Sequence, residues 1–263
     1  FFPASLMGEA RAEIPKVLAT LGYDALMMPE ADTRNGAVET PAEGEKFARF
    51  LREHRGQYDG VLLCLPNFGD ENGAVAAFRD AEVPILIHAY PDAPDKMAPA
   101  VRRDSFCGKF SIMDVFFQNG ITFTALKPHT VAPSSTRFAE NIHHFAAVCR
   151  VTNGLKRMTL GSIGARTTAF KTVRIDEVAL QRAGITMETL DLSDVFEQMK
   201  DVAPGSAVYK DKAAALEACA SWEGVPDGAR DTLTRLGVVI DALIEEYKMD
   251  ALALRCWVEM QTY

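Results

Sequence analysis

A short apolar run, GVLLCLP at Gly60–Pro66, gives the clearest indication of the fold. It has the length of a strand, and the polar, glycine-containing loop Asn67–Gly73 follows it directly. A second apolar run, Val83–Tyr90, comes after a helical stretch at Ala74–Arg79. Apolar strands with helices between them are typical of a parallel sheet covered on both faces. Because crossovers between parallel strands are right-handed, we expect an α/β fold with doubly wound, Rossmann-like sheets.

The sequence before this run continues the same alternation. Ser5–Leu21 and Ala42–Arg55 carry apolar residues at helical spacing and are expected to be helices. Between them, Asp24–Met28 is expected to be a short strand.

A second alternation begins after three prolines between residues 91 and 99. We therefore place a domain boundary near Asp104, with a first α/β domain at residues 1–103 and a second at 104–263. The expected helices of the second domain are Ser111–Asn119, Thr136–Arg150, Asp176–Ala183, Ser193–Met199 with Ser193 as its N-cap, and Asp227–Tyr247. Its expected strands are Arg157–Ile163, Thr186–Leu192 and Asp250–Val258.

The composition is that of an acidic globular protein. The 263 residues are 48% hydrophobic and 24% charged, and the net charge of −8 disfavours binding to nucleic acid phosphates. No apolar run approaches the roughly 20 residues of a membrane helix, so we expect neither nucleic acid nor a membrane as a partner. The five cysteines are scattered and lack zinc-type spacing, which favours reduced thiols and a cytoplasmic protein.

Both ends of the chain suggest a longer protein. The sequence opens with Phe1 instead of Met, and the last expected strand lies close to Tyr263. Because a strand normally leads to a further element, we expect this chain to be part of a longer one.

In open parallel sheets, ligands bind at the carboxyl ends of the strands. This rule selects the loop Asn67–Gly73, the loop Gly161–Thr168, and Glu259 with Gln261 and Thr262. Glu259 stands out because Trp257-Val258-Glu259-Met260 places a carboxylate among large apolar side chains. Such a carboxylate has a desolvated, adjustable pKa or binds a cation. The alternative is a glutamate at a strand end that points to solvent.

The other candidate residues also admit two interpretations. Arg166 follows glycines that resemble a phosphate loop without matching one; it either reaches an oxygen-rich ligand or forms a surface salt bridge. Asp70 and Glu71 either face a ligand or stabilise the start of a helix. His129 lies in a polar loop and is a candidate to face a ligand. His143 and His144 point in different directions from one helix and form a poor chelate.

The segment Leu254–Thr262, LRCWVEMQT, resembles the segment of the L-fucose isomerase family that carries its first metal-binding glutamate. Further similarity to the shorter, fucose isomerase-like branch of that family occurs at Phe1–Pro3, Phe106–Lys109, Phe145–Arg150, Ile163–Arg166, Phe170 and Val173-Arg174. The resemblance covers essentially the whole chain.

The resemblance implies a metal-dependent aldose–ketose isomerase that uses Mn²⁺ or a similar divalent ion and works through an enediolate. Glu259 is then the metal ligand and the catalytic base, and the family's second carboxylate and histidine are expected beyond Tyr263. The family also places its sites between subunits of a homo-oligomer. Sugar-contacting residues are then expected at Asn67, Asp70, Glu71, Arg166 and Gln261.

Two other functions remain open at this point. A two-domain sugar-binding protein without catalysis fits two α/β domains equally well, and so does an inactive relative with an interaction role. Metal dependence separates the isomerase from the binding protein, since a simple binder does not need a cation at Glu259.

Overall fold

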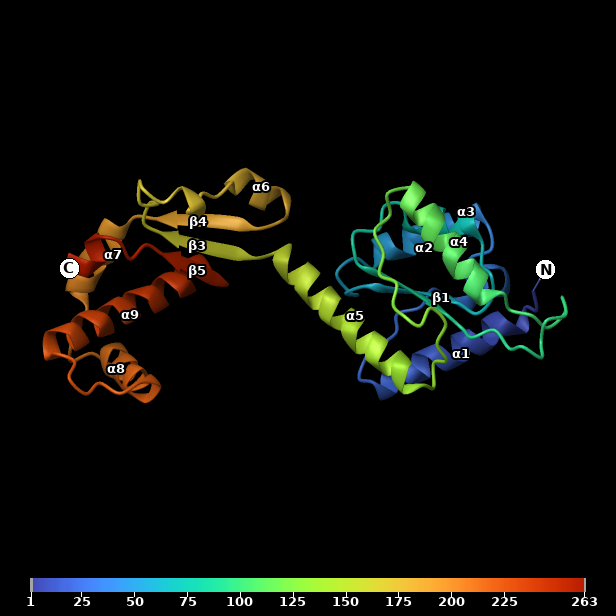
Figure 1. Cartoon of the computed structure of the whole chain (residues 1–263), viewed down its shortest axis with the longest axis horizontal. Helices are drawn as coiled ribbons and strands as arrows, with labels where there is room; N and C mark the ends of the chain where they lie inside the picture. The colour runs from blue at the N-terminus through green and yellow to red at the C-terminus, as the bar shows by residue number, and fades with distance from the viewer. Residues whose placement is uncertain (1, 263) are drawn as a thin grey trace. The chain divides into compact units, whose positions relative to one another are not determined.

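A computed structural model describes residues 2–262, and the chain divides into two compact units, Phe1–Asn153 and Gly154–Tyr263 (Figure 1). We call them unit 1 and unit 2. Among residues 2–262, no helix is long and apolar enough to cross a membrane.

Unit 1 is built on a short parallel sheet. Strands β1 (Val61–Leu65) and β2 (Ile85–Ala89) pair in parallel over their whole length. On the other side of β2, isolated parallel bridges to Thr124 and Thr130 continue the sheet. All five residues of β2 are buried, as expected for a strand with neighbours on both sides.

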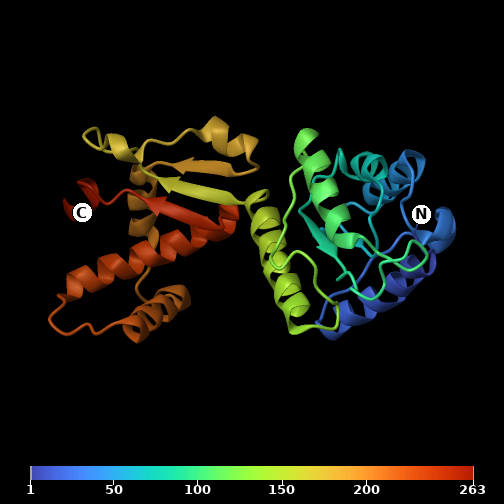
Figure 2. The same ribbon diagram turned by 45° about the vertical axis from the view of Figure 1, so that its right-hand side comes forward.

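Helices cover both faces of this sheet (Figure 2). On one face, α2, α3 and α4 form a core around Phe78, Ile112 and Phe116. On the other face, α1 and α5 pack through Ile14 and Phe138. The helices are α1 (Ser5–Thr20), α2 (Pro41–Glu53), α3 (Glu71–Phe78), α4 (Ser105–Gln118) and α5 (Thr136–Leu155), with 3-10 turns at Glu30–Asp32 and Arg34–Gly36.

Unit 2 contains a three-stranded parallel sheet in the order β4-β3-β5 (Figure 1). Its strands are β3 (Thr159–Ile163), β4 (Thr186–Leu190) and β5 (Ala251–Leu254). Its helices are α6 (Glu177–Arg182), α7 (Leu192–Asp201), α8 (Ala207–Cys219), α9 (Asp227–Tyr247) and α10 (Glu259–Thr262), with a 3-10 turn at Lys171–Val173. Its core joins α7 and α9 to the sheet through Val195, Leu236 and Leu243.

The strand order of unit 2 creates a switch point. The chain forms the central strand β3 first, then places β4 on one side of it and β5 on the other. The loops after β3 and β5 therefore leave the same edge of the sheet next to each other, which is where open α/β sheets bind ligands.

The boundary between the units differs from the one expected at Asp104. Residues 104–153 belong to unit 1, so the division lies between Asn153 and Gly154 instead of separating 1–103 from 104–263. The reason is packing, since α4 and α5 cover the two faces of the β1–β2 sheet. The proline-rich stretch is a loop inside unit 1.

The sheets are also smaller than expected. The structure shows a mixed α/β chain with parallel sheets of two and three strands, which are short for doubly wound, Rossmann-like domains. Asp24–Met28 is extended but forms no strand, and the Met28 carbonyl accepts a hydrogen bond from Arg11 at 2.7 Å instead of a ladder bond. The predicted pairing is confirmed: β1 and β2 are parallel in one sheet, and β3 and β5 are parallel in another.

Two local predictions were wrong for reasons visible in the hydrogen bonds, and two further elements also differ from expectation. Asp191, and not Ser193, is the N-cap of α7, because its carboxylate accepts the Ser193 N–H at 2.8 Å. The α4 helix begins at Ser105, well before the expected start, because the distant Asp92 carboxylate accepts the Ser105 and Phe106 N–H groups. The last strand ends at Leu254, and α8 was not expected at all.

Candidate functional site

The loops after β3 and β5 meet at the switch point of unit 2. Gly164 ends β3 with φ at +83°, a left-handed conformation that glycine adopts without strain. A Cβ atom on Gly164 would lie 3.0 Å from Cβ of Arg255, so the two loops are in close contact there. The geometry brings Arg166 and Glu259 to the same edge of the sheet.

Arg166 shapes its own loop. Its Nη1 donates to the carbonyl oxygens of Thr167, Thr168 and Phe170, each at 3.1 Å. The guanidinium therefore holds residues 166–170 in a tight turn, a role that neither sequence interpretation included.

Trp257 ties the loop after β5 to the loop after β3. Its carbonyl accepts hydrogen bonds from Arg255 Nε at 2.5 Å and from Thr167 Oγ1 at 3.4 Å. Its ring packs against Phe170, with centroids 5.2 Å apart. These contacts fix the segment that carries Glu259.

Glu259 starts α10 and does not follow a strand directly. Its Oε2 lies 2.5 Å from Arg255 Nη2 and accepts the Val258 N–H at 2.8 Å. The hydrogen bond from its own backbone N–H, helped by the Val258 N–H and the Arg255 charge, lowers the pKa of Glu259 against the opposing effect of burial. The expected desolvated carboxylate is therefore corrected: the side chain is 49% exposed and ionised at neutral pH.

Asp191, the N-cap of α7 after β4, adds a second carboxylate to this edge, and the charge of Arg255 contributes to lowering the pKa of Asp191 after its hydrogen bonds from Ser193. Across residues 2–262, no group of three or more His, Cys, Asp or Glu side chains is arranged to hold a metal ion. Divalent cations such as Mn²⁺ need several oxygen or imidazole ligands, so Glu259 alone does not form a metal centre. Gln261 is exposed, and its backbone N–H donates to the Val258 carbonyl at 3.0 Å.

In unit 1, the loop after β1 is held by its own polar side chains. Asn67 Oδ1 accepts the Gly69 N–H at 3.1 Å, and Asp70 Oδ1 accepts the Gly73 N–H at 2.6 Å as the N-cap of α3. The helix-stabilising interpretation of Asp70 is thus the one that its contacts support.

Glu71 has a similar structural contact, because its carboxylate accepts a hydrogen bond from the Ser111 hydroxyl on α4. The loop and α4 also touch through their backbones: a Cβ on Gly108 would lie 2.1 Å from the Phe68 carbonyl oxygen. These contacts anchor the loop against α4. Asn67, Asp70 and Glu71 belong to unit 1, whereas Arg166, Glu259 and Gln261 belong to unit 2.

A polar cluster at the carboxyl end of β2 was missed by the sequence interpretation. The Arg103 guanidinium lies 5.0 Å from the centre of the Tyr90 ring and donates to the Pro66 carbonyl at 2.9 Å. The Tyr90 hydroxyl donates to Glu13 Oε2 at 2.9 Å. Burial, with the nearby Cys64 and Glu13, raises the pKa of Tyr90, so the hydroxyl stays protonated. The position of Tyr90 directly after β2 could have identified it from the sequence, by the same rule that selected the other strand ends.

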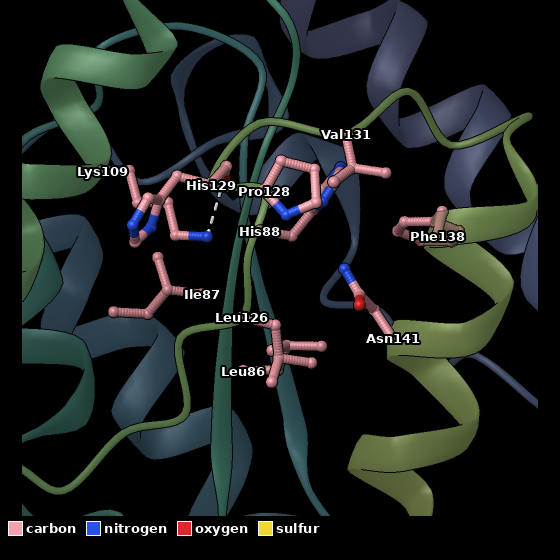
Figure 3. Close-up of a pocket in the computed structure, with 10 residues that line it drawn as sticks. All are labelled: Leu86, Ile87, His88, Lys109, Leu126, Pro128, His129, Val131, Phe138 and Asn141. Carbon is pink, nitrogen blue, oxygen red and sulfur yellow. Dashed lines mark hydrogen bonds between the residues drawn. The ribbon is translucent and has the colours of Figure 1, made fainter.

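A small pocket opens beside β2 in unit 1 (Figure 3). Lys109 on α4 is only 2% exposed and donates from Nζ to the His129 carbonyl at 2.8 Å. Burial lowers the pKa of Lys109 to about 8, and burial together with the Lys109 charge lowers the pKa of His88 to about 3. The pocket is lined by Leu86, Ile87, His88, Lys109, Leu126, Pro128, His129, Val131, Phe138 and Asn141.

His129 lines this pocket, and its expected role of facing a ligand stays a prediction. His143 is held at the surface by a hydrogen bond between its Nδ1 and the Tyr23 hydroxyl at 3.0 Å. The pocket was not predictable from the sequence, since a lysine at a helical position is normally solvated.

Comparison with known protein families gives one match. The family model of the fucose/sulfoquinovose isomerase N-terminal domain matches residues 1–156, which is more than half of the chain. This region includes the whole of unit 1 and leaves Glu259 outside the match. Among curated proteins, no match was found.

Proposed function

The chain belongs to the fucose/sulfoquinovose isomerase family, and from this membership we propose that it works in a metal-dependent aldose–ketose isomerase. The family match over residues 1–156 is the observation that carries the proposal. The substrate is a sugar in its open-chain form, and the reaction passes through an enediolate.

The proposed catalytic residue is Glu259. Its lowered pKa leaves the carboxylate ionised at neutral pH, which both a base and a cation ligand require. As base, the carboxylate takes the proton from C2 of the aldose and returns it to C1, while the hydroxyl proton moves from O2 to O1. Its position at the switch point of unit 2, beside the Arg166 loop, supports contact with a small polar substrate.

We propose that a divalent ion, Mn²⁺ or a similar cation, has Glu259 among its ligands. A bound divalent ion stabilises negative charge on the two oxygens of an enediolate. Because Glu259 is a single donor paired with Arg255, further carboxylate or imidazole ligands must come from outside residues 2–262. The Arg255 side chain must also yield its contact with Oε2, or share the carboxylate, when a cation binds.

The remaining site residues keep supporting roles in the proposal. Arg166 and Gln261 contact the sugar from unit 2, and the anchored loop with Asn67, Asp70 and Glu71 contacts it from the first domain of a neighbouring subunit. We further propose a homo-oligomer with its sites at subunit interfaces. A cytoplasmic location is proposed because all five cysteines are free thiols.

The second candidate is a sugar-binding protein without catalysis. The observation that favours it is that no three His, Cys, Asp or Glu side chains of residues 2–262 are arranged to hold a metal ion. Binding without isomerisation would then depend on Arg166 and Gln261, and it would not respond to a chelator.

The deciding experiment measures isomerisation of a panel of aldoses by the intact protein, with and without added Mn²⁺. Glu259→Gln keeps the size of the side chain and removes its charge, so activity should fall by about 10²–10⁴ or more. The control is Glu246→Gln, an exposed glutamate on α9. Wild-type activity that survives a chelator, or an unimpaired Glu259→Gln enzyme, would show that the assignment is wrong. Sugar binding without turnover in both proteins would favour the binding-protein candidate.

A further inference from the structure

Lys109 is a buried cation without an anionic partner in its pocket. Its side chain is 2% exposed, and neither Asp nor Glu is among the residues that line the pocket. The hydrogen bond to the His129 carbonyl satisfies one of its three N–H donors and supplies no charge. Burying an ammonium group this deeply is costly unless a negative charge compensates it.

Two imidazole nitrogens in the same pocket also lack partners. His88 is 5% exposed, and its Nε2 is buried without a hydrogen bond, as is Nδ1 of His129. Burial and the Lys109 charge lower the pKa values of both histidines, and the Lys127 charge adds to the effect on His129. Both rings are thus neutral at pH 7, and each unpartnered nitrogen is able to carry its ring's N–H as a donor.

The size and the walls of the pocket restrict what it holds. It has room for about one water molecule, and six of its lining residues are apolar. Figure 3 shows Lys109 and His129 on the α4 side of the pocket, with Phe138 and Asn141 opposite them on α5. A sugar or a carbonyl reagent is too large to enter. A water molecule fits, but it leaves the ammonium charge uncompensated.

We propose that this pocket binds one small monovalent anion of chloride size beside Lys109 Nζ. The anion accepts hydrogen bonds from the ammonium group and from the N–H group of the neighbouring His129 imidazole. The surrounding apolar walls strengthen the attraction between the two charges because they exclude water. The site lies in unit 1 and does not depend on the proposed isomerase activity.

The proposal predicts how the affinity depends on pH. The anion binds the protonated form of Lys109, whose pKa is about 8 in the empty pocket. Affinity should therefore be high at pH 6.5 and fall as the pH rises through and above about 8. Lys109 and the two neutral histidines are the titratable groups that line the site, the exposed Lys127 acts on His129 through its charge, and no carboxylate lines the site.

The first test is crystallographic. Crystals of the full chain soaked in sodium bromide at pH 6.5 should show an anomalous peak in contact with Lys109 Nζ. A peak height typical of water, with no anomalous signal, would overturn the proposal and leave a buried water as the occupant.

The second test measures thermal unfolding in solution. Raising bromide from about 1 mM to about 100 mM, with a bulky organic anion keeping the ionic strength constant, should raise the Tm by on the order of 5 °C for a dissociation constant near 1 mM. Lys109→Met should remove this response, whereas Lys16→Met, at an exposed position on α1, should retain it. Equal responses of both variants, or no response of the wild type, would contradict the proposal. The bromide-soaked wild-type crystal remains decisive where Lys109→Met does not fold.

Discussion

Arg255 Nη2 and Glu259 Oε2 lie 2.5 Å apart, so a guanidinium occupies the carboxylate that the family resemblance assigns to catalysis. The two residues are four positions apart in the sequence. A hydrogen bond from Arg255 Nε to the Trp257 carbonyl holds the guanidinium next to the Glu259 carboxylate. The hydrogen bond from the Glu259 backbone N–H is the main cause of the lowered pKa of Glu259 and the Arg255 charge adds to it, but the ion pair also competes with any cation for Oε2. The same guanidinium that favours the ionised form of Glu259 therefore also blocks its Oε2 from a cation.

The first prediction concerns this ion pair. Arg255→Met should raise the pKa of Glu259 towards its ordinary value, because the charge and the hydrogen bonds of the guanidinium are lost. The change should remain partial, since the Val258 N–H still donates to Oε2. A carboxyl-carbon NMR titration measures it, with the Glu259 signal assigned from the Glu259→Gln variant. An unchanged titration curve would mean that Arg255 does not contact the carboxylate in solution.

The second prediction separates the two interpretations of Asp70. Asp70→Ala removes the N-cap of α3 and should lower the free energy of unfolding of unit 1 by about 0.5–2 kcal/mol. Asp70→Asn should recover most of the loss because an amide oxygen also caps a helix. Trp222 and Trp257 both lie in unit 2, so unit 1 is best followed by amide hydrogen exchange in β2.

The control for Asp70 is Asp80→Ala, an exposed aspartate just after α3. It should leave the exchange rates unchanged. A capping residue changes stability and leaves the apparent affinity for sugar unaltered, whereas a sugar-contacting residue weakens that affinity even as Asn. A loss of affinity in Asp70→Asn with unchanged stability would favour the sugar-contacting role.

Strands and their pairing were predictable because apolar runs of strand length carry the signal within themselves. GVLLCLP became β1, and its parallel partner β2 lay where the second apolar run predicted. The boundary between units was not predictable in the same way. The amphipathic face of α5 shows that Phe138 and Phe145 are buried, but it does not show which sheet they cover.

The candidate site was predictable in position and not in detail. The rule that ligands bind at strand ends located Glu259 and Arg166 at one edge of unit 2, and the structure brings their loops together. Hydrogen bonds between backbone and side chain decided the rest, since Arg166 bonds carbonyls in its own loop and Asp92 caps a helix far along the chain. The burial of Lys109 depends on the packing of α4 against residues 126–131, which no local pattern encodes.

The third prediction concerns the contact between α4 and the loop after β1. Gly108→Ala places a Cβ 2.1 Å from the Phe68 carbonyl oxygen, which is far too close. Because the atoms in contact are backbone atoms, they cannot adjust easily. We expect a loss of about 1–3 kcal/mol or more in the free energy of unfolding of unit 1. The matched control is Gly8→Ala on α1, where nothing lies within 4 Å of the new Cβ. It should stabilise unit 1 by about 0.5–1 kcal/mol, since alanine is the better helix former. Equal effects of the two variants would contradict the close approach.

The fourth prediction concerns acid destabilisation by His88. Burial and the Lys109 charge lower its pKa to about 3 in the folded protein, whereas an unfolded histidine titrates near 6.5. Below pH 6.5 the unfolded chain therefore binds a proton that the folded chain does not bind, and the free energy of unfolding falls as the pH falls. Between pH 6.5 and pH 5, this one group should cost about 2 kcal/mol.

His88→Leu removes the titrating group and fills the same apolar surroundings beside Phe138, so it should be less sensitive to this change of pH than the wild type. His144→Gln, at an exposed position on α5, should behave like the wild type. The measurement is the stability of unit 1 from β2 amide exchange at pH 7 and pH 5, at a fixed bromide concentration so that occupancy beside Lys109 is controlled. If His88→Leu lost as much stability as the wild type on acidification, the proton uptake would belong to another group, and a neutral, buried His88 would no longer explain why the pocket beside Lys109 holds only one positive charge.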